Sequence, residues 1–275
     1  MTANPTEHDL RLWGHRGAPA ELPENTLASF RRALERGANA LELDVHLPSD
    51  GVPIVSHDPS GRRTAGIRKP IHETALAELR RWDLGQGLHM PTLAEVLGEL
   101  PAVPLSVDLK PRIRSAIDPV LGVIDRHGAA ERVTVASFHD SILRAVRRRG
   151  YPGPTSLARG EIARLFALPL RLARLLARAG SAAQVPVRHG PVVFGTRRFI
   201  AKCHALGLRV DFWTIDDPAA AARLLELGAD GVMSNDPAAL APVFAAAGPK
   251  HRSVGLSTPI EARACDPQAT RGDSR

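Results

Sequence analysis

The chain has 275 residues, of which 44% are hydrophobic and 24% charged, a balance typical of a globular protein and not of a disordered chain. Its 36 Lys+Arg against 29 Asp+Glu give a formal net charge of +7, which raises nucleic acid or an anionic membrane as partners to be tested. The sequence contains no run of about 18 or more uncharged apolar residues, which excludes a membrane-spanning helix.

Short runs of strand-forming residues alternate with helical stretches along most of the chain. The strands are predicted, in chain order, at 11–13, 40–47, 53–57, 104–109, 132–137, 155–158, 183–187, 209–214 and 231–234. The helices are predicted at 25–36, 93–100, 114–126, 141–149, 162–178, 196–206, 218–227 and 237–246. Strands that alternate with helices of this length indicate a parallel sheet.

The predicted strands are one more than a closed (β/α)8 barrel needs. Ser49-Asp50-Gly51 is a tight-turn signal, so 40–47 and 53–57 are predicted to form a hairpin. We therefore predict an α/β fold, a (β/α)8 TIM barrel forming a single catalytic domain over residues 10–247. Residues 1–9 and 248–275 lack apolar periodicity and are predicted to be flexible tails. The alternative is an open doubly wound sheet, which no GxGxxG or P-loop motif supports.

Ionisable side chains gather at the predicted carboxyl ends of the strands, where barrel enzymes carry their chemistry. They are His15, Glu42, Asp44, His57, Asp108 and Lys110. Glu42 and Asp44 are two residues apart and so lie on one face of their strand, and Asp108 with Lys110 repeats the spacing. Charges buried in such apolar strands are costly unless they are paired or bind a metal.

These residue types fit one kind of chemistry. Three carboxylates form an all-oxygen ligand set, which prefers hard cations such as Mg²⁺ or Ca²⁺. Two histidines supply an acid and a base near neutral pH, while Arg16 and Lys110 supply positive charge for an anionic group. Together they predict metal-assisted cleavage of a phosphate ester. Taken singly, each residue also has an ordinary structural explanation, such as packing for Trp213.

Short motifs surround these residues in a fixed order. They are His15-Arg16-Gly17, Pro23-Glu24-Asn25-Thr26, Glu42-Leu43-Asp44-Val45, His57-Asp58, Pro91-Thr92-Leu93, Val107-Asp108-Leu109-Lys110, Ser137-Phe138, Trp213-Thr214 and Gly228-Ala229-Asp230-Gly231. This pattern covers about residues 11–240 and resembles that of the glycerophosphodiester phosphodiesterases. The resemblance implies a TIM barrel with a small insertion after the second strand, at about 59–90.

The resemblance also implies an activity, the metal-dependent hydrolysis of glycerophosphodiesters to glycerol 3-phosphate and an alcohol. By match to the family motifs, Glu42, Asp44 and Asp108 hold one divalent metal ion, Mg²⁺ or Ca²⁺. The substrate is then a small-molecule glycerophosphodiester.

Further roles follow from the same match. His15 and His57 form the acid/base pair, and which of them is the acid stays open. Arg16 and Lys110 bind the phosphate, and Trp213 lines the alcohol side of the pocket.

Three of the motifs depart from the family pattern. Asp108 stands where the family usually has Glu, which is similar to the related sphingomyelinase D toxins. Ser234-Asn235 stands where the family has Thr-Asp, and Ile215-Asp216 stands where it has Val-Asn. These departures bear on substrate preference more than on reaction type.

Two other classes of function stay open. One is a lysophospholipase D-like or sphingomyelinase D-like lipid phosphodiesterase, which a deep apolar groove beside Trp213 would favour. The other is a non-catalytic protein that binds through its basic charge. No basic motif interleaved with aromatic residues supports nucleic acid as the partner.

The positive charge is concentrated in residues 144–178, which contain nine arginines and one acid, Glu161. Within the predicted helix 162–178, Arg164, Arg171, Arg174 and Arg178 fall on one face. An ordinary barrel helix is favoured there, and peripheral membrane contact through 162–178 is the alternative. The first residues lack a secretory-signal pattern and the two cysteines lack CxxC spacing, so we expect a cytoplasmic protein.

Overall fold

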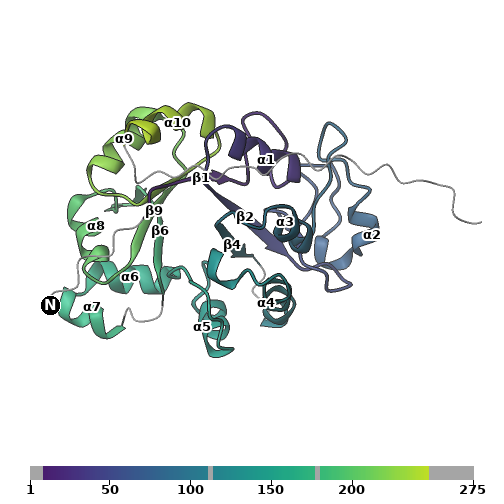
Figure 1. Ribbon diagram of the computed structural model, residues 1–275. Helices are drawn as coiled ribbons and strands as arrows, with labels where there is room; N and C mark the ends of the chain where they lie inside the picture. Colours follow the sequence, from purple (N-terminus) through teal and green to yellow (C-terminus); the bar gives the residue numbers. More distant parts are fainter. Residues whose placement is uncertain (1–8, 111–113, 177–179, 248–275) are drawn as a thin grey trace, which may run out of the picture.

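The computed structural model describes residues 9–110, 114–176 and 180–247. The tails predicted at 1–9 and 248–275 therefore lie, except for Asp9, outside the described residues. Helices surround a curved sheet of parallel strands (Figure 1). This arrangement confirms the predicted α/β barrel class.

The barrel strands are β1 (Arg11–His15), β2 (Ala40–His46), β4 (Leu105–Leu109), β5 (Val133–Ala136), β6 (Ala182–Pro186), β9 (Arg209–Trp213) and β10 (Gly231–Ser234). They pair side by side in the order β5-β4-β2-β1-β10-β9-β6. Thr155 forms a parallel bridge to Val135 of β5, and Ser156 forms one to Ala182 of β6. Residues 155–156 thus take the eighth strand position and close the barrel, within the predicted strand 155–158.

The helices that cover the barrel are α1 (Leu27–Glu35), α3 (Leu93–Glu99), α4 (Ile117–Arg126), α5 (Asp140–Arg148), α6 (Arg159–Ala167), α7 (Leu170–Leu176), α8 (Arg197–His204), α9 (Pro218–Glu226) and α10 (Pro237–Ala246), with short 3₁₀ turns η2 (Arg114–Ala116) and η3 (Ala130–Arg132). Five of them begin after a side chain that accepts a backbone N–H of the first turn: Thr26, Thr92, Thr196, Asp217 and Asp236. These caps satisfy N–H groups that have no partner within the helix and so set where each helix begins.

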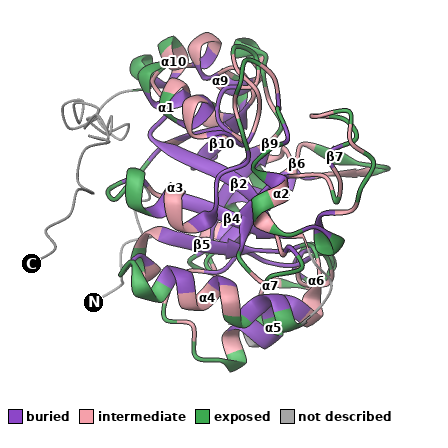
Figure 2. Ribbon diagram, turned by 90° about the vertical axis from the view of Figure 1, so that its right-hand side faces the viewer, coloured by how far each residue is buried: buried purple, intermediate pink, exposed green. Residues whose placement is uncertain are grey.

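The strands are buried, whereas the surrounding helices have a buried side and an exposed side (Figure 2). Leu12, Leu41, Val107 and Val210 are all fully buried and belong to one apolar core with residues of the surrounding helices, such as Phe30 of α1. Successive side chains of a strand point in opposite directions. On each strand, the residues that alternate with these outward-facing apolar residues therefore face the barrel interior. The site residues that lie on strands belong to that interior set: His15, Glu42, Asp44, Asp108 and Trp213.

The predicted helix over 162–178 is two helices, α6 and α7, so the prediction of a single helix is wrong. Leu168 has an extended backbone, with φ −85° and ψ 148°, and it precedes Pro169. The proline ring disfavours the helical conformation of the residue before it, which ends α6. The single arginine face predicted for 162–178 is therefore split between two helices, and Arg178 lies outside the described residues.

The predicted hairpin after the second strand is confirmed. Strand β3 (Ile54–Val55) pairs antiparallel with β2, and Gly51 takes the positive φ of 76° that the turn requires. The insertion follows, with the 3₁₀ turn η1 (Ile71–Glu73) and helix α2 (Leu76–Leu79). Together with Ile54 of β3 it forms a small second apolar core, made of Ile71, Leu79, Trp82, Leu84 and Met90.

A second hairpin, β7 (Arg188–His189) with β8 (Val192–Val193), was absent from the predicted elements. It projects from the body of the barrel beside β6 (Figure 2). In the part of the chain that the structure describes, no helix has both the length and the apolar character needed to cross a membrane.

Candidate active site

All the side chains singled out from the sequence line one cavity of about 190 Å³ at the carboxyl ends of the barrel strands. They are His15, Arg16, Glu42, Asp44, His57, Asp108, Lys110 and Trp213. They come from β1, β2, β4 and β9 and from the loops after β1, β3 and β4. The structure thus brings the predicted site residues together in one cavity.

Strand register brings the acidic and basic groups side by side. His15 of β1 pairs with Glu42 of β2, and Asp44 pairs with Asp108 of β4. On β1, Trp13 lies one interior position below His15, is fully buried, and donates its indole N–H to Asp211 at 3.0 Å. The cavity thus opens above a filled barrel interior, as expected for this architecture.

Lys110 lies between two carboxylates. Its Nζ is 2.8 Å from Asp44 and 2.6 Å from Asp108. Burial alone would lower the pKa of Lys110, but Asp108, Asp44 and Glu42 raise it above its ordinary value. Burial would raise the pKa of Asp44, but Lys110 and Arg16, whose Nε is 3.3 Å away, hold it below its ordinary value. Lys110 is therefore a fixed cation at the centre of the acidic group.

Glu42, unlike Asp44, has a carboxylate oxygen without a hydrogen-bond partner in the part of the chain that the structure describes. Its side chain is buried, and its Oε2 has no hydrogen-bond partner among the described residues. Burial, reinforced by the charge of Asp44, raises the pKa of Glu42 well above its ordinary value. His15 Nε2 lies 3.8 Å from this oxygen. A buried carboxylate with an unsatisfied oxygen is costly, so Glu42 is suited to receive a cation.

As the side chains lie, no group of three His, Cys, Asp or Glu in the described ranges is gathered closely enough to hold a metal ion. The donor chemistry nevertheless fits one. Glu42, Asp44 and Asp108 are buried oxygen donors lining the same cavity, and one of them has an unsatisfied oxygen. Such all-oxygen sets suit Mg²⁺ or Ca²⁺.

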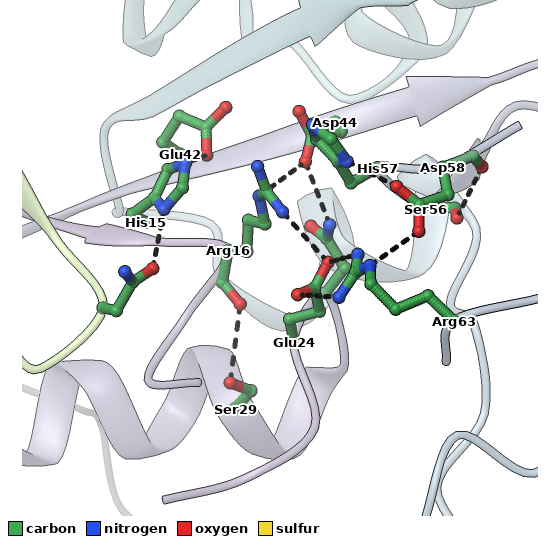
Figure 3. Close-up of polar contacts among 12 residues, drawn as sticks. His15, Arg16, Glu24, Ser29, Glu42, Asp44, Ser56, His57, Asp58 and Arg63 are labelled. Atoms are coloured by element: carbon green, nitrogen blue, oxygen red, sulfur yellow. Dashed lines mark hydrogen bonds and ion pairs between the residues drawn. The ribbon is translucent and has the colours of Figure 1, made fainter. Parts of the chain in front are cut away.

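The His57 side chain is fixed by a chain of hydrogen bonds and ion pairs (Figure 3). Its Nδ1 donates to Asp58 at 2.7 Å, and Asp58 accepts from Arg63 Nε at 2.7 Å. Arg63 also donates two hydrogen bonds to Glu24, at 2.6 and 2.8 Å, and Glu24 accepts a third from Arg16 at 3.2 Å. Arg63 belongs to the insertion, so the insertion braces both His57 and Arg16.

Sequence reasoning missed the residues that hold the two histidines. Asp58 and Glu24 stood within the quoted motifs, so their position was a usable signal. Arg63 stands in the insertion, and its sequence context gives no sign of its contacts. Asn235 accepts a hydrogen bond from His15 at 2.8 Å, although the two residues are far apart in the chain.

Trp213 connects the polar cavity to an apolar one. Its ring meets Phe138 edge-on, with centroids 5.9 Å apart. A second cavity of about 400 Å³ shares both rings and continues between α6 and the β7–β8 hairpin. Its apolar lining includes Phe138, Leu157, Ile162, Phe166, Phe194 and Trp213. The apolar groove considered beside Trp213 is therefore present.

Comparison with known proteins agrees with this geometry. The model of the glycerophosphoryl diester phosphodiesterase family matches residues 15–239. A Mycobacterium tuberculosis protein named "Probable glycerophosphodiester phosphodiesterase 2" is 32% identical over 242 residues, 84% of this chain and 91% of that protein. A glycerophosphodiester phosphodiesterase of Caldanaerobacter subterraneus subsp. tengcongensis is 28% identical, over 82% of this chain and 94% of its own.

A solved structure gives the same result. The Oleispira antarctica phosphodiesterase OLEI02445, in complex with the product sn-glycerol-3-phosphate, is similar with a TM-score of 0.73 and 25% identity. The similarity covers 86% of this chain and 96% of that one. The chain belongs to the glycerophosphoryl diester phosphodiesterase family.

Proposed function

We propose that this protein hydrolyses glycerophosphodiesters to glycerol 3-phosphate and an alcohol, by histidine acid/base catalysis with one divalent metal ion. The observation that carries the proposal is the single cavity in which two histidines, three carboxylates and two cations meet. The product complex of the similar Oleispira antarctica enzyme supports the choice of product. A cytoplasmic location stays a prediction.

Arg16 and Lys110 would attract and orient the phosphate. Both line the cavity, and both are held in place by carboxylates, Arg16 by Glu24 and Lys110 by Asp108. Cations fixed before the substrate arrives need little reorganisation when negative charge develops on the phosphate oxygens.

Glu42, Asp44 and Asp108 would hold the divalent ion, which when bound supplies charge neutralisation and polarises a phosphoryl oxygen. The unsatisfied, buried Glu42 oxygen supports this assignment, because a bound cation would supply the partner that it lacks. Burial and the Asp44 charge raise the pKa of Glu42, and a cation beside it would stabilise the ionised form that both disfavour.

His15 and His57 would move the protons. One imidazole takes a proton from the nucleophile, either water or a neighbouring substrate hydroxyl, as the new P–O bond forms. The other gives a proton to the leaving alkoxide as the P–O bond to the alcohol breaks. Both rings line the cavity, and each has its Nδ1 engaged, by Asn235 and by Asp58, which leaves Nε2 for the reaction.

The test is a panel of glycerophosphodiesters. Purified protein is incubated with glycerophosphocholine, glycerophosphoethanolamine or glycerophosphoglycerol, with Mg²⁺, Ca²⁺ or a chelator. Glycerol 3-phosphate should appear with at least one diester and disappear with the chelator. A protein that releases none from any of these diesters with either ion does not have the proposed activity.

A second candidate function is the hydrolysis of single-chain lipids, as in lysophospholipase D-like or sphingomyelinase D-like enzymes. The observation that favours it is the apolar cavity that opens from the polar one past Trp213. The acyl chain of a lysolipid whose phosphate occupied the polar cavity would bury apolar surface there, at about 0.8 kcal/mol for each CH₂.

A matched pair of variants tests this candidate. Phe166 lines the apolar cavity, whereas Leu172 of α7 does not, and both side chains are exposed. Phe166→Asp should lower kcat/KM for lysophosphatidylcholine about tenfold or more and leave glycerophosphocholine unchanged, while Leu172→Asp should change neither. Equal turnover of lysolipid by wild type and Phe166→Asp contradicts the candidate. Binding of the same proteins to anionic vesicles tests peripheral membrane contact through 162–178.

A further inference from the structure

The His15 ring is held by Asn235, a residue that lies far from it in the sequence. His15 is the last residue of β1, and Asn235 directly follows the neighbouring strand β10. The two strands bring them together, because Gly14 of β1 pairs with Ser234 of β10. His15 Nδ1 lies 2.8 Å from the side-chain Oδ1 of Asn235. A histidine ring nitrogen and an amide can pair in two ways, because either partner can be the donor.

Asp216 decides between these two ways. Asn235 Nδ2 donates to Asp216 Oδ2 at 3.0 Å, and an ionised carboxylate only accepts hydrogen bonds. The NH₂ group of Asn235 must therefore face Asp216, and its oxygen must face His15. The proton of neutral His15 is then on Nδ1, and Nε2 is the unprotonated nitrogen.

Asp216 is itself fixed in place. Its Oδ1 accepts from the backbone N–H of Asn235 at 2.7 Å and from the hydroxyl of Ser234 at 2.9 Å. Both side chains of this pair, Asp216 and Asn235, are positions where the sequence departs from the family pattern. The structure joins the two departures in one hydrogen-bonded pair.

We propose that Asp216 is a positioning residue of the active site, which fixes the orientation and the tautomer of His15 through the amide of Asn235. The proposal rests on the proposed function in one respect, that His15 takes part in the reaction. Asp216 is not one of the residues that line the cavity, and its hydrogen bonds go to Ser234 and Asn235, so it reaches His15 through Asn235. Partners that orient metal-bound imidazoles contribute about 10–100-fold to activity, and we expect an effect of that order for His15.

Single substitutions break the pair in different ways. In Asp216→Asn, nothing forces the Asn235 amide to keep its oxygen toward His15, so the amide can turn over and offer NH₂ to Nδ1. In Asn235→Asp, two carboxylates face each other and repel. Each change should lower kcat about 10–100-fold, while KM and the melting temperature stay close to those of wild type.

The reciprocal exchange is the decisive variant. In Asp216→Asn/Asn235→Asp, the new amide at 216 can donate to the new carboxylate at 235, and that carboxylate can accept from His15. Every hydrogen bond of the native pair can then form with the partners exchanged. The double variant should recover at least tenfold in kcat over the weaker single variant, which independent effects of the two changes cannot give.

The chain offers a matched control. Asp217 is the next residue, and it caps α9 by accepting from the N–H groups of Ala219 and Ala220. Asn is an equally good cap, so Asp217→Asn makes the same chemical change one position along and should leave kcat unchanged.

The tautomer gives a readout that is independent of turnover. In the ¹⁵N spectrum of the wild type, His15 should show a protonated Nδ1 and a bare Nε2, and Asp216→Asn should shift the ring toward a mixture. An unchanged His15 spectrum and an unchanged kcat in Asp216→Asn overturn the proposal, as does a double variant no better than either single. If the wild type turned over no diester, the proposed function would fail while this spectrum still tested the role of Asp216.

Discussion

Lys110 keeps two buried carboxylates of the cavity from repelling each other. Asp44 and Asp108 face each other on paired strands, and the ammonium group lies within 2.8 Å of both. Removing one member of a buried charge cluster costs about 3–5 kcal/mol, because the remaining charges lose their partner. The cation therefore serves the fold as well as the substrate.

This leads to a prediction for metal-free protein. In the presence of a chelator, Lys110→Met should have a lower melting temperature than wild type. Adding Ca²⁺ or Mg²⁺ should then raise the melting temperature of the variant by more than it raises that of wild type. The added ion would replace the missing positive charge among the carboxylates. The check is thermal unfolding of both proteins with and without the ion. A variant as stable as wild type in chelator would show that Lys110 does not balance these carboxylates.

The brace of His57 gives a second prediction. Arg63→Gln removes the group that holds Asp58 and Glu24 together, and should lower kcat about tenfold with little change in melting temperature, since Arg63 is half exposed. Arg62→Gln is the matched control, because Arg62 is the adjacent arginine, is also exposed, and forms no ion pair with the described residues. Equal kcat in Arg63→Gln and Arg62→Gln would contradict the bracing role.

The difference between predicted and missed site residues has a physical cause. Glu42, Asp44 and Asp108 stand out in sequence because ionisable side chains are rare in apolar strands. Asn235 and Arg63 are polar residues in loops, where polar residues are expected. Their contacts depend on which strands become neighbours, and that is decided by the closure of the whole barrel.

At the scale of elements, local signals located most helices and strands to within a few residues. The eighth strand was also located, at 155–158, but it is shorter than predicted, since only Thr155 and Ser156 form bridges to β5 and β6. The β7–β8 hairpin was missed since strands of two residues are too short to show alternation. The break between α6 and α7 is signalled in the sequence by Pro169 itself.

Helix α3 begins with a side-chain cap whose contribution to stability can be measured. Thr92 accepts from the Glu95 N–H, and the Glu95 carboxylate accepts from the Thr92 N–H, a capping box. Thr92→Ala should lower the free energy of unfolding by about 1 kcal/mol. Urea unfolding measures the change. Thr64→Ala, in the insertion loop, is the control and should be nearly neutral; equal losses would indicate that the cap contributes nothing specific.

At the scale of the whole molecule, the net charge of +7 is distributed unevenly. Residues 144–178, with nine arginines and one acid, carry a formal charge of +8, so the rest of the chain sums to −1. Several of these arginines are nevertheless paired with acids. The pairs are Arg147 with Glu161, Arg149 with Asp118, and Arg164 with Asp140. Two of these acids lie outside the segment, so the flank is less basic in the fold than in the sequence. These ion pairs argue against the hypothesis of a non-catalytic protein that binds its partner through basic charge.

Stability should also depend on pH through His204 of α8. Its Nε2 lies 2.8 Å from Asp230, and this hydrogen bond raises the pKa of His204 above its ordinary value. A raised folded-state pKa gives stabilisation that is complete below the unfolded pKa of about 6.5 and is lost as pH rises through the folded value.

The melting temperature of His204→Ala should therefore fall below that of wild type by more at pH 5.5 than at pH 8.5. For a partly exposed pair the difference is about 1 kcal/mol or less, or a few degrees for a chain of this size. A gap between the two proteins that is the same at both pH values would contradict the contribution of this ion pair.

The central claim is that diester hydrolysis takes place in the cavity between His15 and His57. The most direct measurement is the release of glycerol 3-phosphate from glycerophosphodiesters by wild type and by the His15→Ala/His57→Ala variant, with circular dichroism to confirm that both are folded. Loss of each acid/base group should cost about 100-fold or more, so the folded double variant should show almost no turnover. A folded double variant that releases product at the wild-type rate would contradict the claim.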